Sequence, residues 1–182
     1  MKLKQPSWPK DLPSEGVLGL ATLGPIGMRM RAPGTWGSAV GVLFFVVCCF
    51  SYGIVENLIA SALLAYFAVG ICGEAEIRMG RRDPGEVILD EFVAMPLCFL
   101  GWQMIVGPGF LEFLGLLIAG FALFRFYDIK KPLVINSLQD LPGGWGIVID
   151  DTAAALATCA TLHLAHAVWA LAFWGTKAVM GH

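Results

Sequence analysis

Residues 83–102 read DPGEVILDEFVAMPLCFLGW, an apolar run that carries two adjacent acids, Asp90 and Glu91, close to its start. About 20 residues of helix cross roughly 30 Å of hydrocarbon, so the surrounding segment 87–106 is long enough to span a bilayer. The DPGE at residues 83–86 is typical of a helix start, with an aspartate cap, a proline at the first helical position and a glutamate that completes a capping box. The sequence therefore predicts a membrane helix with carboxylates just inside its first turn.

The composition of the whole chain is that of an integral membrane protein. Apolar residues make up 57% of the sequence and the mean hydropathy is +0.72, whereas ordinary soluble domains contain about 45–50% apolar residues. No linker, charge run or low-complexity tract divides the chain, so we expect one domain over residues 1–182. The fold class we expect is an all-α, polytopic bundle.

Hydropathy predicts about five transmembrane helices. The candidate spans are residues 38–55, 58–77, 87–106, 110–126 and 152–174. The segment 16–30 is also apolar, but glycines and Pro25 interrupt it, so the amino-terminal residues 1–30 are expected to be interfacial or re-entrant. That segment leaves the helix count open by one.

Basic residues are distributed unevenly between the two sides of the predicted bundle. With the amino end inside, eleven of the twelve lysines and arginines fall in cytoplasmic loops, and only Lys177 falls outside. The positive-inside rule favours this orientation. We therefore expect an outside carboxyl end and cytoplasmic loops that hold nearly all of the acids as well as the bases.

Two predicted spans begin with an adjacent pair of acids, Asp90 with Glu91 and Asp150 with Asp151. An ionised carboxylate in a membrane helix costs on the order of 3 kcal/mol at the bilayer centre and less near an end, so such residues usually face a cavity or a partner. A divalent cation between the two pairs would supply that partner, and oxygen ligands favour magnesium. The alternative is a favourable interaction with the helix dipoles, which explains one acid per helix more easily than two.

Two glycine-rich turns with the pattern P-G-x-W-G precede spans on the same side, APGTWGSAVG at 32–41 and LPGGWGIVIDD at 141–151. Glycines let backbone N–H groups approach a phosphate, and the hydroxyls of Thr35 and Ser38 are further donors. The alternative is that these glycines serve as ordinary turn or helix-packing residues.

The segment FRFYDIKKP, residues 124–132, supplies cations beside the carboxylates. Arg125 and Lys131 are what a metal-bound phosphate ester would require. Arg125 and Asp128 are three apart and are expected to form a salt bridge if they share a helix. Lys131 precedes Pro132, which predicts that the helix ends there. The alternative is a juxtamembrane basic cluster that attracts anionic lipid.

In this order, APGTWGS, DPGEVILDE, FRFYDIKKP and GGWGIVIDD resemble the bacterial phosphatidylglycerophosphatase A family over about residues 31–155. The resemblance implies a magnesium-dependent enzyme of the bacterial inner membrane, with its active site facing the cytoplasm, that removes the terminal phosphate of phosphatidylglycerophosphate. The matching positions are Gly34, Thr35, Gly37, Ser38, Asp83, Asp90, Glu91, Arg125, Asp128, Lys131, Pro132, Gly143, Gly144, Gly146, Asp150 and Asp151. Ala94, Ala155 and Val134 depart from the family pattern at packing or loop positions.

From the pattern and the resemblance we expect three groups of site residues. The expected magnesium ligands are Asp90, Glu91, Asp150 and Asp151. The expected phosphate-binding residues are Gly34, Thr35, Ser38, Arg125 and Lys131. The expected catalytic residues are Asp83, Asp128 and Lys131. Either aspartate is a candidate general base, and attack by an aspartate on phosphorus remains an alternative.

A divalent-cation channel or carrier is the competing class of function, but it predicts acids distributed across the membrane depth, whereas these crowd one face. His163 and His166 are expected to make interhelical hydrogen bonds. The expected partners are the lipid substrate and the bilayer, without nucleic acid; a homo-oligomer is compatible with the sequence. The number of metal ions and the acyl-chain and head-group selectivity stay open.

Overall fold

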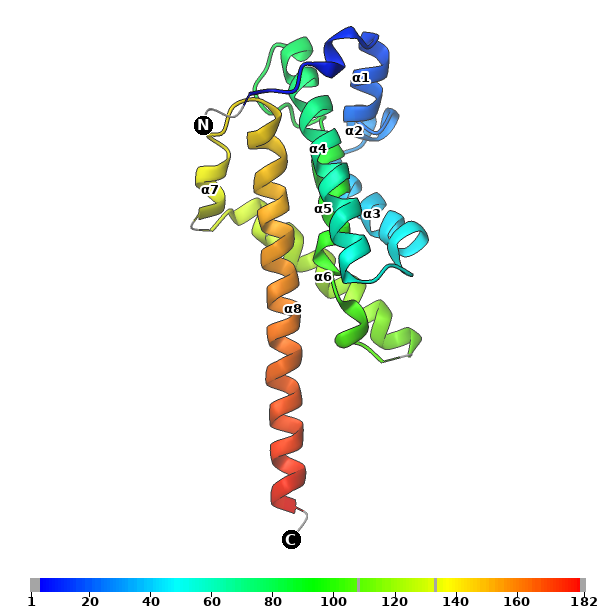
Figure 1. The fold of residues 1–182 in the computed structure, drawn as a ribbon, viewed down its shortest axis with the longest axis vertical. Coiled ribbons are helices and arrows are strands. Elements are labelled where there is room, and N and C mark those ends of the chain that lie inside the picture. Colours follow the sequence, from blue (N-terminus) through cyan, green and yellow to red (C-terminus); the bar gives the residue numbers. More distant parts are fainter. Residues whose placement is uncertain (1–3, 108, 133, 181–182) are drawn as a thin grey trace.

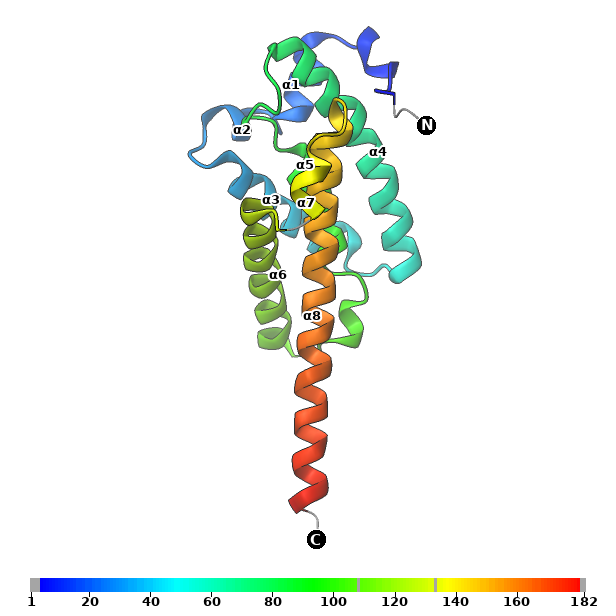
Figure 2. The same cartoon turned by 90° about the vertical axis from the view of Figure 1, so that its left-hand side faces the viewer.

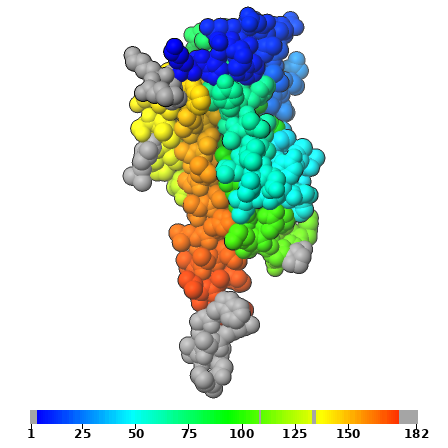
Figure 3. Space-filling model, in the orientation of Figure 1, coloured from blue at the N-terminus to red at the C-terminus, as the bar shows by residue number. Residues whose placement is uncertain are grey.

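The computed structural model describes residues 4–107, 109–132 and 134–180, with side chains left out for residue 134 and from residue 174 onward. The described chain is entirely helical, as the sequence predicts, and contains no strand in these ranges. The molecule is elongated, with the amino-terminal segment at one end and the last turns of α8 projecting alone at the other (Figures 1 and 2). Figure 3 shows the orange turns of α8 emerging below the other helices.

Three helices are long and apolar enough to cross a membrane, counted over the described residues. They are α4 (Ile54–Met79), α6 (Phe110–Lys130) and the described apolar part, Gly144–Phe173, of α8 (Gly144–Met180). They contain the predicted spans 58–77 and 110–126 and nearly all of 152–174. In Figures 1 and 2, α4 and α6 run toward the end that carries the amino terminus, whereas α8 runs away from it.

The predicted span 38–55 is displaced toward the amino terminus, to residues 33–49. The helix α3 (Pro33–Phe44) continues into a π-helical turn, η2 (Phe45–Cys49), and the remaining residues form the turn into α4. At 1.5 Å per residue, α3 and η2 together are about 25 Å long. They begin earlier than predicted because Pro33 fits the first helical position after Ala32, which adopts a left-handed conformation.

The predicted span 87–106 is wrong in length, because its helix, α5 (Leu89–Cys98), has only 10 residues. Pro96 cannot donate the backbone hydrogen bond of a helix interior, and Gly101 turns the chain with φ of 66° before a 3₁₀ turn, η3 (Trp102–Met104). At about 15 Å, α5 spans half of a hydrocarbon layer. It is buried and contacts α3, α4 and α8, so its apolar character reflects burial in protein. Among the described residues, three helices rather than the expected five meet the length and hydropathy of a membrane span.

The predicted capping box at residues 83–86 is also wrong. These residues form a turn in which Val87 N donates to Pro84 O at 2.8 Å, and the N-cap of α5 is Ile88. Ile88 N donates to the carbonyl oxygen of Ala21 at 2.9 Å, which ties the loop to α1 (Ser14–Ala21). The Glu86 carboxylate pairs with Arg81 at 3.0 Å, and this hydrogen bond lowers the pKa of Glu86.

The amino-terminal segment forms short helices that pack on the bundle. The helices α1 and α2 (Pro25–Arg29) occupy the predicted interfacial or re-entrant piece; α1 packs on α4 and α2 on α3. Before them lies a 3₁₀ turn, η1 (Trp8–Asp11). Gln5 lies between α4 and α8: its Nε2 donates to Val69 O at 3.0 Å, and its Oε1 accepts from Gly144 N at 2.9 Å. These two hydrogen bonds of Gln5 fix the start of α8 against α4.

Two clusters of buried side chains hold the helices together, and α5 contributes to both. One gathers Val17, Ile71, Leu89, Val93 and Val148 near the amino-terminal end. The other centres on phenylalanines, including Phe45 and Phe99, whose rings lie 4.6 Å apart. His163 was expected to bond to another helix; its Nε2 instead lies 2.8 Å from Leu100 O, in the turn that follows α5.

Candidate active site

The acidic pairs predicted from sequence meet where the first turn of α5 faces the second turn of α8. One carboxylate oxygen each from Asp90, Glu91 and Asp151 lies within 4.8 Å of the others, and this group of three is called the acidic triad below. Asp150 is adjacent in sequence but does not belong to the triad. Asp150 instead forms an ion pair with Lys131.

The acidic triad is deeply buried and incompletely satisfied. Asp90 is 6% exposed and Asp151 is 3% exposed. Among the described residues, Asp90 Oδ1 and Glu91 Oε2 are buried without a hydrogen-bond partner. Burying an ionised carboxylate is strongly unfavourable unless a cation or several donors compensate it. The triad is therefore arranged for a positive ligand.

The triad forms one wall of a pocket of about 130 Å³, called the inner pocket below. Its polar lining consists of Asp83, Asp90, Glu91, Asp128, Lys131, Asp150 and Asp151. Six carboxylates thus surround the cavity, whereas Lys131 is the only cation that the described residues contribute to its lining. This excess of negative charge in a small space is the second feature that favours a bound divalent cation.

Lys131 reaches the inner pocket from the end of α6. Its φ of 42° is left-handed, and its N–H donates to Tyr127 O at 2.8 Å, so α6 ends before Pro132 as predicted. Its Nζ lies 2.5 Å from Asp150 Oδ2. Burial lowers the pKa of Lys131. The hydrogen bond that its ammonium group donates to Asp150, together with the negative charges of the nearby acids, outweighs burial and raises the pKa above its ordinary value. Lys131 therefore places a positively charged group beside the triad.

Arg125 links three helices at the edge of the triad. Its Nη1 lies 2.7 Å from Asp128 Oδ2, which confirms the predicted salt bridge, and 3.6 Å from Glu91 Oε1. The same nitrogen donates to Ser38 Oγ at 3.4 Å, and Ser38 in turn donates to Gly34 O at 2.8 Å. Arg125 therefore connects α6 to both α3 and α5.

The first glycine turn lies directly against the triad. A Cβ on Gly34 would overlap Glu91 Oε1, and one on Gly37 would press on Ile88 and Glu91. The glycines therefore permit close packing of α3 on α5. Ser38 is buried and holds Arg125, whereas Thr35 makes no side-chain hydrogen bond within the described residues. Phosphate binding by Gly34, Thr35 and Ser38 stays a prediction.

The second glycine turn has a packing role at the start of α8. Gly143 has φ of 57° and faces Gln5, while a Cβ on Gly144 would overlap the backbone carbonyl of Val69. A Cβ on Gly146 would press on the carbonyl oxygens of the preceding loop. These contacts place α8 so that Asp151 faces α5.

Comparison with known proteins adds a direct result to this geometry. The sequence profile of the phosphatidylglycerophosphatase A family matches residues 19–166. The chain belongs to this family. A phosphatidylglycerophosphatase A of Haemophilus influenzae is 34% identical over 154 residues, which cover 81% of this chain and 83% of that protein. The Escherichia coli phosphatidylglycerophosphatase A is 27% identical and covers 80% of both chains.

A third relative carries a different name. A putative phosphatidylinositol-3-phosphatase of Bacteroides thetaiotaomicron is 28% identical over 134 residues, which cover 71% of this chain and 80% of that protein. No solved structure matches the chain. Membership in the phosphatidylglycerophosphatase A family makes the chain a phosphatase, and the matched range 19–166 contains every acid of the inner pocket together with Arg125 and Lys131. The channel or carrier alternative is therefore disfavoured.

Asp83 stands apart from the other acids in this phosphatase. It makes no hydrogen bond or ion pair within the described residues, and its φ of 45° is unusual for a residue with a side chain. Such backbone strain persists only where the surroundings impose it, and it clusters at functional sites. The left-handed turn directs the Asp83 carboxylate into the lining of the inner pocket, although Asp83 lies outside α5.

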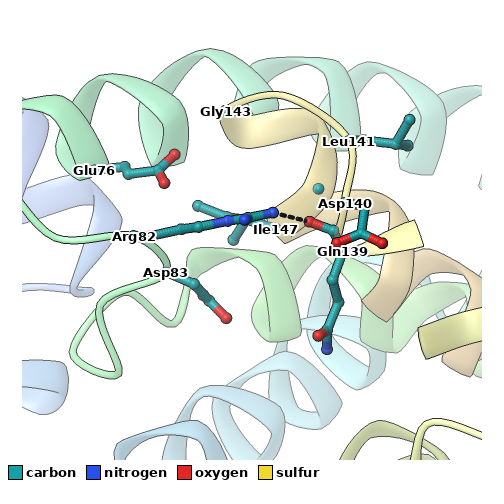
Figure 4. Close-up of a pocket in the computed structure, with 9 residues that line it drawn as sticks. Glu76, Arg82, Asp83, Gln139, Asp140, Leu141, Gly143 and Ile147 are labelled. Atoms are coloured by element: carbon teal, nitrogen blue, oxygen red, sulfur yellow. Dashed lines mark hydrogen bonds between the residues drawn. The ribbon is translucent and has the colours of Figure 1, made fainter. Parts of the chain in front are cut away.

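A second, larger cavity of about 360 Å³, called the outer pocket below, shares Asp83 and Ile147 with the inner pocket. Figure 4 shows Arg82 extending across it toward Gln139, with Glu76 on one side of Arg82 and Asp83 on the other. Arg82 Nη2 donates to Gln139 O at 2.6 Å, which joins the loop after α4 to the segment before α8. The two pockets are therefore neighbours, with Asp83 and Ile147 between them. The helix α7 (Val134–Leu138) ends directly before Gln139.

Sequence reasoning missed Gln5, Arg82 and Gln139. Gln5 fixes the start of α8, while Arg82 and Gln139 shape the outer pocket. The Gln5 side chain bonds to backbone groups of Val69 and Gly144, and the Arg82 side chain bonds to the backbone carbonyl of Gln139. No local motif signals such contacts, and only the three-dimensional arrangement reveals them.

Proposed function

We propose that this chain is a magnesium-dependent phosphatidylglycerophosphatase, which hydrolyses the terminal phosphomonoester of phosphatidylglycerophosphate to phosphatidylglycerol and phosphate. The observation that carries the proposal is the acidic triad with its two unpaired oxygens beside Lys131, in a chain of the phosphatidylglycerophosphatase A family. We place the reaction at the cytoplasmic face of the bacterial inner membrane, as the distribution of basic residues predicts.

The donor set of the triad fits magnesium. All three candidate ligands are carboxylates, and magnesium prefers oxygen donors and is usually held by one or two carboxylates together with phosphate oxygens and water. Asp90, Glu91 and Asp151 would hold the ion. Asp150, also expected as a ligand, is proposed instead to orient Lys131, because its Oδ2 is bound to Nζ of that lysine. A bound magnesium ion would polarise the phosphoryl oxygens and favour in-line attack by water.

The cations of the chain are arranged to receive a phosphate. Lys131 lines the inner pocket, and Arg125 lies at its edge, next to Glu91 and Asp128. Charge-assisted hydrogen bonds from both would neutralise charge on the phosphoryl oxygens as the ester bond breaks. Neighbouring acids fix both side chains before substrate binds, so little reorganisation accompanies the reaction.

Asp83 is the better placed of the two expected bases. The Asp128 carboxylate is engaged by Arg125 at 2.7 Å, whereas Asp83 has no such partner within the described residues. A free carboxylate in the pocket lining serves as a base toward water or as a nucleophile toward phosphorus. Acid-quench trapping of a phosphorylated protein distinguishes the two routes.

Phosphate release from phosphatidylglycerophosphate in detergent micelles tests the proposal. The native protein should release phosphate with magnesium and stop with a chelator, and Asp90→Asn should abolish release while remaining folded. Phosphatidic acid and phosphatidylinositol 3-phosphate serve as comparison substrates. A folded native protein that releases no phosphate from phosphatidylglycerophosphate with magnesium would contradict the proposed substrate.

A further inference from the structure

An apolar groove lies between α3 and α6, outside the site described above. It has a volume of about 320 Å³ and is lined by Ala39, Val42, Leu114, Leu117, Ile118 and Phe121. No polar residue contributes to this lining. Ile118 is 61% exposed, so the groove opens sideways, toward the surface that a bilayer would cover.

The groove is continuous with the phosphate-binding end of the site. On α3, Ser38 and Val42 are four residues apart and therefore lie on one face; on α6, Phe121 and Arg125 have the same spacing. Arg125 donates to Ser38 at 3.4 Å, while Val42 and Phe121 both line the groove. Val42 and Phe121 thus lie about 6 Å, four residues along each helix, beyond the contact between Ser38 and Arg125.

The position of the groove along α6 matches the two ends of a lipid. Arg125 lies near the end of the candidate span Phe110–Lys130, whereas Leu114, Ile118 and Phe121 lie in its middle. These four residues share one stripe of α6, while Leu116, Gly120 and Phe124 form the buried stripe. A ligand with an anionic head at Arg125 and an apolar tail along this stripe would fill both parts.

We infer that the groove between α3 and α6 binds an acyl chain of the lipid substrate, so that the substrate enters sideways from the bilayer with its phosphate directed to Arg125 and Lys131. This inference rests on the proposed function, since it names the tail-binding part of the same site. The polar outer pocket, which shares Asp83 with the inner pocket, is then left for water and released phosphate.

Filling the groove tests the inference. The variants are Val42→Phe and Ala39→Leu, and the matched control is Leu111→Phe, at a residue of α6 that is 78% exposed and does not line the groove. Each protein is assayed with dioleoyl phosphatidylglycerophosphate in micelles and with the deacylated, water-soluble headgroup. We expect KM for the lipid to rise about fivefold or more in the groove variants, with kcat/KM for the headgroup within about twofold of native. The control should match native on both substrates.

Two results would overturn the inference. Groove variants with the native KM for the lipid would show that the groove is covered by bulk lipid, and equal losses on lipid and headgroup would show a disturbed site. A native protein that cleaves neither substrate would instead count against the proposed function. Photo-crosslinking in Asp83→Asn, which removes the proposed base or nucleophile and leaves the acidic triad intact, then gives a readout without turnover. A diazirine acyl chain should label residues 39–42 and 114–121 from phosphatidylglycerophosphate but not from phosphatidylcholine, and equal labelling contradicts the inference.

Discussion

Nζ of Lys131 lies 2.5 Å from Oδ2 of Asp150, so a salt bridge joins the end of α6 to the second turn of α8. The same aspartate accepts a hydrogen bond from Asp151 N at 3.0 Å through its other oxygen. Asp150 therefore aims the lysine into the inner pocket while its neighbour Asp151 joins the acidic triad. One acidic pair thus supplies two different functions.

Removing the charge of Lys131 should separate its role in phosphate binding from its role in stability. Lys131→Met should lower kcat/KM for phosphatidylglycerophosphate on the order of 100-fold, because a charge-assisted contact to phosphate is lost. The variant also leaves Asp150 buried and unpaired, so the melting temperature in detergent should fall. Lys131→Met with Asp150→Asn should recover the melting temperature but not the activity. Recovery of both would show that Lys131 has only a structural role.

Arg125 should not tolerate replacement by lysine. One guanidinium nitrogen contacts Asp128, Glu91 and Ser38, and an ammonium group on a shorter, differently shaped side chain cannot keep this geometry. We expect Arg125→Lys to lose about tenfold to 100-fold in kcat/KM. Ser38→Ala, which removes only the acceptor, should lose less. Steady-state assays in micelles measure both, and native activity in Arg125→Lys would contradict the assigned contacts.

A single methyl group at Gly34 should disrupt the site. The new Cβ in Gly34→Ala would overlap Glu91 Oε1, so Glu91 must move out of the triad. We expect weaker magnesium activation, seen as a rightward shift of the magnesium dependence of phosphate release. The control is Gly115→Ala in α6, where a Cβ meets no atom within 4 Å and helix propensity favours alanine by about 0.5–1 kcal/mol. Equal behaviour of the two variants would exclude close packing at Gly34.

Gln5→Ala should loosen the start of α8. It removes hydrogen bonds to Val69 O and from Gly144 N, and leaves partly buried backbone groups unsatisfied, at a cost of about 1–3 kcal/mol. The matched control, Gln103→Ala in η3, removes an exposed hydrogen bond to Tyr52 O in the turn before α4. Thermal unfolding in detergent should give a lower melting temperature for Gln5→Ala than for Gln103→Ala. Identical melting temperatures would contradict the role of Gln5 in holding the start of α8 against α4.

The sequence predicted the features that depend on local pattern. Hydropathy located α4, α6 and α8, and the spacing of Arg125 and Asp128 predicted their salt bridge. The crowding of acids on one face predicted that α5 and α8 would bring carboxylates together, and Asp90, Glu91 and Asp151 do meet.

Other features depend on contacts distant in sequence. Residues 87–106 are as apolar as a membrane span, but burial in protein gives the same composition, so hydropathy could not show that α5 ends at Cys98. The capping motif at residues 83–86 was overridden by the hydrogen bond from Ile88 to Ala21. The separation of Asp150 from the triad depends on where α6 places Lys131, which no spacing within the chain encodes.

Metal binding by the acidic triad is the central claim, and titration of the purified protein with Mn²⁺, followed by electron paramagnetic resonance and competed with Mg²⁺, tests it most directly. The matched variants are Asp151→Asn, within the triad, and Asp140→Asn, an acid of the outer pocket. We predict that Asp151→Asn weakens binding about tenfold or more while Asp140→Asn binds as native. Native affinity in a folded Asp151→Asn protein would contradict the claim.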